Sequence, residues 1–125
     1  MSKYPTAINP ELVGTYPLMT KAGGGGFYDD VLEYRVWCHS HKGGGDFFNA
    51  FATYEEALAF SRTRKGAEKP LVLVRQKEWI FPPRDREGKF THEKGERLTE
   101  WGVEWLSTLK RGPDSIKEYI EQHSK

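Results

Sequence analysis

The sequence predicts a single α+β domain whose small sheet is flanked by helices. Three features of the 125-residue chain support this: an alternating segment at 31–40, a capped helix that begins near Thr53, and an aliphatic run at 71–74. The elements follow one another as strand, helix, strand, a segment of strand or helix, and a last helix. This order indicates an α+β domain, and we expect a split sheet of antiparallel type.

Composition limits the classes of partner and compartment. The 19 Lys and Arg residues are nearly balanced by 18 Asp and Glu residues, so no overall charge attracts nucleic acid or a membrane surface. The single cysteine, Cys38, excludes an intramolecular disulfide and suits a reducing compartment. The first residues do not resemble a signal peptide, and the longest aliphatic run is too short to span a bilayer. We therefore expect a cytoplasmic protein with no nucleic-acid or membrane partner.

The first 26 residues predict an extended arm rather than a regular element. Pro5, Pro10 and Pro17 are spaced so that neither a helix nor a central strand runs through them. The glycines at 23–26 then predict a flexible turn. The α+β body occupies the remaining residues, 27–125, as one domain.

The segment at 31–40 alternates with the period of a β-strand. One face of this strand is apolar and consists of Leu32, Tyr34, Val36 and Cys38. The other face consists of Glu33, Arg35, Trp37 and His39. The first face therefore belongs to the core. The second face is polar yet carries Trp37, which indicates the wall of a cleft.

The next two elements have clear boundaries. Thr53 and Glu56 form the capping-box pattern of a helix start, and Gly66 is a plausible terminator. Residues 70–76 then show the pattern of a buried strand, which extends to about Phe81 before two prolines.

The remaining segment allows two interpretations. Residues 83–97 are highly charged and predict a loop or an exposed hairpin. Residues 98–109 place their apolar side chains on one helical stripe, but 96–101 also fit a strand that leads into a helix near Gly102. The last helix is predicted to begin near Pro113 and Asp114. Its apolar face consists of Ile116, Tyr119, Ile120 and His123.

Several motifs contain reactive or metal-binding residue types but do not predict a specific site. His39 and His41 would need a third metal ligand, such as His92 or Asp46, and no spacing fixes one, so no metal is assigned. Neither glycine run has the order of a phosphate-binding loop or of the dinucleotide-binding fingerprint. Cys38 and His39 are adjacent and point to opposite faces of a strand, which excludes a catalytic pair.

An acyl-CoA-dependent N-acetyltransferase is an outside possibility. Its pyrophosphate-binding motif requires Arg or Gln, two residues, Gly, one residue, then Gly or Ala at a junction between strand and helix. The closest approach is residues 62–67, where Gly66 falls one place late and at a helix end.

Three stretches together resemble the ADP-ribosyltransferase superfamily. YRVWCHS at 34–40 resembles its first core strand, which ends in a histidine. FNAFATYEEALAF at 48–60 resembles its aromatic strand that leads into a helix, and PLVLVRQ at 70–76 resembles the strand that follows. The resemblance covers about residues 31–81. The chain also resembles small bacterial proteins of unknown chemistry with similar YRVWCH and EWGVEWL stretches.

The resemblance implies an NAD site and names its residues. His39 would hold the ribose beside the nicotinamide, and Phe51 and Phe60 match the positions of aromatic contacts. Glu78 or Glu96 would stabilise the positive charge that develops on the sugar. The cleft face of the first strand adds Arg35 and Trp37 to the cofactor-binding candidates. One departure is that the tyrosine expected on the aromatic strand is replaced by Ala50 or Phe51.

Two classes of function stay open. The first is an NAD-dependent ADP-ribosyl or glycosyl transferase, or a relative that has lost this chemistry. The second is a non-catalytic homo-oligomer or ligand-binding module that uses the Trp-lined cleft for a small molecule or a partner. The surplus of aromatic residues, Trp101 and Trp105 in particular, favours a homodimer.

Overall fold

A computed structural model describes residues 4–17, 21–22, 27–39, 45–81, 91–106 and 110–123 of the chain. The glycine-rich turn predicted at 23–26 lies outside these residues. His41 and most of the glycine-rich crossing before Asp46 also lie outside them.

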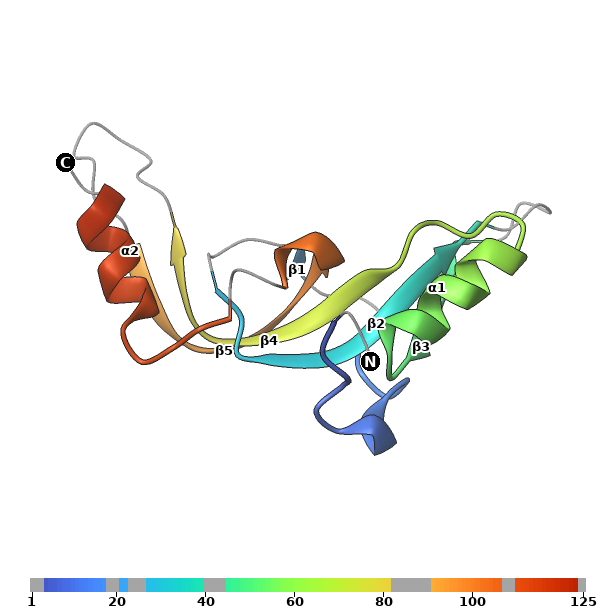
Figure 1. Cartoon of the computed structure of the whole chain (residues 1–125), viewed down its shortest axis with the longest axis horizontal. Coiled ribbons are helices and arrows are strands. Elements are labelled where there is room, and N and C mark those ends of the chain that lie inside the picture. The colour runs from blue at the N-terminus through green and yellow to red at the C-terminus, as the bar shows by residue number, and fades with distance from the viewer. Residues whose placement is uncertain are drawn as a thin grey trace.

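The described residues form five strands, two α-helices and two short 3-10 helices (Figure 1). The strands are β1 (Lys21–Ala22), β2 (Asp30–Cys38), β3 (Phe47–Phe51), β4 (Leu71–Phe81) and β5 (Thr91–Gly102). The helices are η1 (Pro10–Leu12), α1 (Tyr54–Thr63), η2 (Val103–Trp105) and α2 (Ser115–His123).

The strands form one sheet in the order β1-β5-β4-β2-β3. Only β1 and β5 are parallel, and every other neighbouring pair is antiparallel. The predicted α+β class and antiparallel character are therefore confirmed. The predicted split is wrong, because the five strands of the described region are joined in one hydrogen-bonded sheet. This sheet curves strongly, and α1 and α2 lie toward its opposite ends (Figure 1).

The main core lies between β2, β4 and α1. Tyr34, Val36 and Cys38 of β2 pack against the buried Ala57 of α1, as the alternating sequence predicts. The helix begins as predicted, because the Thr53 hydroxyl accepts a hydrogen bond of 3.2 Å from the backbone N–H of Glu56. A main-chain reversal follows the helix, and Gly66 adopts a φ of 85° there.

The two interpretations of residues 96–109 are resolved in favour of the strand. Trp101 pairs with Val72 of β4 and is buried in the main core. The strand ends at Gly102, and the 3-10 helix η2 follows it. Residues 91–97 pair with β4, so the charged segment contains the predicted hairpin. Trp105 on η2 is 53% exposed, so of the two tryptophans only Trp105 is free for a partner.

The last helix packs on a smaller second core. Ile116 of α2 is buried against Phe27 and Ile80, with Tyr119 and Ile120 beside them. These positions confirm the apolar face that the sequence predicts for this helix. The side chain of His123, the fourth residue of the predicted face, lies outside the described part of the structure.

Residues 4–17 wrap around one edge of the sheet. The N–H of Ile8 donates to the carbonyl of Val31, beyond the point where β3 stops pairing with β2. The hydroxyl of Tyr34 donates to the carbonyl of Pro5, whereas Glu33 accepts a hydrogen bond from the N–H of Gly14. Tyr34 and Glu33 are neighbours on a strand and point to opposite faces. The arm therefore passes from the α1 face of the sheet to the opposite face.

Candidate functional site

The fully buried guanidinium of Arg35 organises the face of the sheet opposite α1. Its Nε lies 2.7 Å from Glu33 Oε2, its Nη1 lies 2.9 Å from Glu100 Oε2, and its Nη2 donates to the carbonyl of Pro17 at 2.6 Å. The guanidinium carbon also lies 4.2 Å from the centre of the Phe48 ring. We call Glu33, Arg35, Trp37, Phe48 and Glu100 the Arg35 cluster.

Strand register explains how these residues meet. Glu33 and Arg35 are two residues apart on β2 and therefore share a face. Leu73 of β4 lies between Glu33 and Glu100 in the sheet, which brings Glu100 of β5 to the same face. Trp37 completes the cluster, because its indole N–H donates to Glu100 Oε2 at 3.1 Å. Phe48 is the cross-strand neighbour of Trp37, with ring centres 5.1 Å apart.

Two of the predicted cofactor-binding residues thus share one face as expected. Both side chains contact Glu100 and Phe48, and Arg35 also contacts the carbonyl of Pro17 in the arm. A hollow of about 330 Å³ lies elsewhere, between the arm and the side chains of Tyr28 and Lys110.

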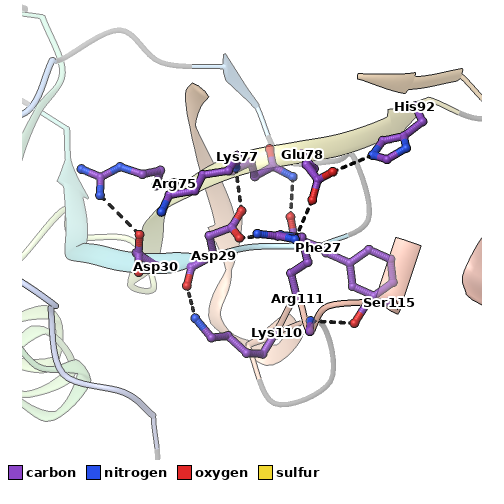
Figure 2. A network of polar contacts seen from close by, with 12 residues as sticks. Phe27, Asp29, Asp30, Arg75, Lys77, Glu78, His92, Lys110, Arg111 and Ser115 are labelled. Atoms are coloured by element: carbon purple, nitrogen blue, oxygen red, sulfur yellow. Dashed lines mark hydrogen bonds and ion pairs between the residues drawn. The ribbon is translucent and has the colours of Figure 1, made fainter. Parts of the chain in front are cut away.

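A second polar cluster fixes the segment that precedes α2 (Figure 2). The carboxylate of Asp29, which is only 7% exposed, accepts from the N–H of Lys77 at 2.6 Å and from Arg111 Nε at 2.5 Å. Arg111 Nη1 also lies 2.5 Å from Glu78 Oε2, and His92 Nε2 lies 3.2 Å from Glu78 Oε1. We call these five residues the Asp29 cluster. It ties the chain before α2 to β4 and to the start of β2.

Both predicted catalytic glutamates are engaged in ion pairs. Glu78 belongs to the Asp29 cluster, as Figure 2 shows. Glu96 lies at the surface, 2.8 Å from Arg75 Nε, and Arg75 Nη1 lies 3.3 Å from Asp30. Neither carboxylate contacts the Arg35 cluster.

His39 is exposed at the other end of the sheet. Its Nδ1 lies 2.8 Å from Asp46, and its Nε2 lies 2.6 Å from Glu68. The hydrogen bond and charge of Asp46, assisted by those of Glu68, raise the pKa of His39 above its usual value. The protonated ring therefore joins the end of β2 to the residue before β3 and to the segment after α1.

The two predicted aromatic contacts belong to the core. Phe51 and Phe60 pack on each other with ring centres 5.3 Å apart, on the α1 side of the sheet. Arg35 and Trp37 lie on the opposite side. The structure therefore separates the aromatic candidates from the charged ones.

The predicted NAD-binding residues are also far apart along the sheet. Arg35 of β2 pairs with Leu71 of β4. His39 lies four residues beyond this pair in one direction along the sheet. Glu78 lies seven residues beyond it in the opposite direction. At about 3.3 Å per strand residue, the separation of His39 and Glu78 is about 35 Å. Glu96, which contacts Arg75, is separated from His39 by about 30 Å on the same scale. The structure does not bring either glutamate to the histidine.

The two outer edges of the sheet differ in charge. On the side away from β4, β5 pairs within the described region only with β1, at Thr99 and Glu100. The rest of this edge carries the charged or titratable side chains of His92, Glu93, Lys94, Glu96 and Arg97. A register shift also interrupts the β4–β5 ladder near Gly95. Charges and irregularities of this kind protect an edge strand from pairing with another chain.

The opposite edge strand, β3, has none of this protection. Its sequence FFNAF contains no charged residue, and Phe47 at its start is 38% exposed. β3 pairs with β2 on one side, and no described residue forms a backbone hydrogen bond with its other side. Among the described residues, the nearest backbone contact is from the N–H of Ala7 to the carbonyl of Ala52, just after β3, so the outer amide and carbonyl groups of β3 itself have no described partner.

The described ranges contain neither a metal-binding cluster nor a membrane-spanning helix. No group of three or more His, Cys, Asp or Glu side chains there is arranged to hold a metal ion. None of the helices in that part of the chain is long and apolar enough to cross a bilayer.

Comparison with known proteins found no matching family model, no similar curated protein and no similar solved structure. The resemblance to ADP-ribosyltransferases therefore stays a prediction from the sequence.

Glu33, Phe48 and Glu100 are site residues that the sequence did not single out. Alternation places Glu33 beside Arg35, and this signal was available. The contact between Arg35 and Glu100 joins residues 65 positions apart and depends on the register of three strands. No local pattern specifies that register.

We predict that Arg35→Met destabilises the fold by about 3–5 kcal/mol, because it leaves the carboxylate of Glu33 buried without its cation. The free energy of unfolding from urea titration measures this loss. The double variant Glu33→Gln, Arg35→Met should recover part of it. Equal stability of wild type and Arg35→Met would contradict a buried ion pair at this position.

We also predict that His39 makes stability depend on pH. Its folded-state pKa is raised, so its contribution is fully present below the unfolded value of about 6.5 and is lost as pH rises through the folded-state pKa. The melting temperature of wild type should exceed that of His39→Gln at pH 5.5 but not at pH 9, where the ring has lost its proton and its positive charge. An identical difference at both pH values would show that the ion pairs are not formed.

Proposed function

We propose that the protein is a binding module that recruits an extended polypeptide segment along β3 by β-addition. The observation that carries the proposal is the uncharged, aromatic edge of β3, which pairs only with β2 in the described region. An added strand satisfies the outer amide and carbonyl groups of the edge, and its side chains contact those on both faces of the sheet.

The side chains around β3 provide contacts for such a strand on both faces. Phe48, with Trp37 behind it, lies on the face of the Arg35 cluster. Phe47 lies on the α1 face, where the guanidinium carbon of Arg64 is 6.0 Å from its ring centre. Because successive side chains of a strand alternate between faces, an incoming segment with apolar residues at alternate positions would contact these aromatic rings.

In this proposal, the Arg35 cluster has a structural role: it holds the side chains that border the β3 edge, and it is not catalytic. Arg35 contacts the ring of Phe48 and, through Glu100, is linked to Trp37. The buried ion pairs thereby hold the aromatic side chains that border the edge. A fixed edge loses less conformational entropy when it binds a strand.

The alternative implied by the resemblance is an NAD-dependent transferase. It requires His39 and a glutamate to contact one ribose, whereas their separation is about 30–35 Å along the sheet. Each of these residues is also engaged in its own ion pairs. These observations favour the binding module.

We predict that peptides selected for binding to the immobilised protein alternate apolar and polar residues and lose affinity for Phe47→Lys. The lysine places a charge at the edge of β3, and edge lysines oppose strand addition. The matched control is Trp105→Lys, which replaces another exposed aromatic residue with the same charge on η2. Peptides that bind wild type and Phe47→Lys with equal affinity would contradict β-addition at β3.

A second prediction concerns nucleotide cofactors: neither millimolar NAD nor acetyl-CoA should raise the melting temperature. A ligand at a hundredfold excess over its dissociation constant stabilises a protein by about 2.7 kcal/mol. For a domain of this length, that corresponds to a shift of several degrees. Such a shift with NAD would favour the transferase, and one with acetyl-CoA would favour acyl transfer.

A further inference from the structure

We infer that the segment that occupies the edge of β3 is β3 of a second copy of this chain, placed antiparallel across a two-fold axis at Asn49. This inference rests on the proposed function, because it names the partner of the same edge. It joins two five-stranded sheets into one continuous sheet.

The sequence of β3 is suited to pairing with itself. With Asn49 opposite Asn49 of the second copy, each Phe48 faces an Ala50, and each Phe47 faces a Phe51. A large ring beside a small methyl group avoids crowding on one face, and two phenylalanine pairs form on the other. Each Asn49 amide has both donors and acceptors, so the pair can hydrogen-bond across the axis.

The helix α1 lies so that the same two-fold axis brings two copies of it together. Arg64, just after α1, approaches Phe47 at the start of β3, whereas Tyr54 at the start of α1 follows β3 after two residues. The helix therefore runs back along the strand. Five strand residues span about 16 Å and ten helical residues about 15 Å, so the middle of α1 lies near the middle of β3.

Directly opposite residues of paired strands point to the same face, so both copies of α1 would lie on one face of the joined sheet, side by side and antiparallel.

The test is sedimentation analysis of the full chain from micromolar to near-millimolar concentration. We expect a dimer for wild type and for Trp105→Lys, and a monomer for Phe47→Lys. Circular dichroism and the melting temperature of each variant establish that it is folded. A wild-type monomer at near-millimolar concentration, or a dimer that survives Phe47→Lys, would overturn the inference. Loss of the dimer in Trp105→Lys alone would place the interface on η2 and would also overturn it.

The outcomes separate this inference from the proposed function. A monomeric wild type whose selected peptides still require an unmodified Phe47 would retain β-addition and reject the second copy as partner. Peptides that are indifferent to Phe47→Lys would reject β-addition itself.

Discussion

The burial of one positive charge constrains the whole central sheet. Removing Arg35 from water is costly unless its guanidinium is fully paired, and its partners come from β2, from β5 and from the arm. Those partners meet only when β2, β4 and β5 are aligned in the observed register. The ion pairs therefore oppose a one-residue slip, which would turn the Arg35 side chain to the apolar α1 face. In this sense the Arg35 cluster specifies the arrangement of the strands more than it adds to their stability.

The two edges of the sheet differ in whether they oppose or permit pairing with a further strand. The β5 edge carries charges of both signs, and these oppose pairing with another strand. The β3 edge has the reverse composition, with aromatic residues and no charge. In a monomeric domain, an exposed apolar edge is an aggregation risk without a stabilising contact. The contrast within a single sheet is what favours a partner at β3.

Local sequence signals predicted the elements and failed at the contacts between them. The alternation in β2 and the capping pattern at Thr53 depend on neighbouring residues, and both elements formed as predicted. Residues 98–109 had the spacing of a helix, and residues 96–101 also fitted a strand. Pairing with the buried strand β4 decides for a strand as far as Gly102. The candidate NAD site depends on contacts of the same long-range kind. Whether His39 meets a glutamate depends on distance across the sheet, and the histidine pairs instead with Asp46 and Glu68.

The two hydrophobic cores have a consequence for cooperativity. The core around Tyr34 and the smaller one around Ile116 share no residues, and the polar Asp29 cluster links the second to the rest of the sheet. Ionic links of this kind weaken when their carboxylates are protonated, whereas buried apolar contacts carry no charge to titrate. Because the second core contains only three buried residues, we expect the α2 end to open locally at a lower free energy than the main core. Because β3 packs against the main core through Phe51 and pairs with β2, this opening leaves the binding edge in place.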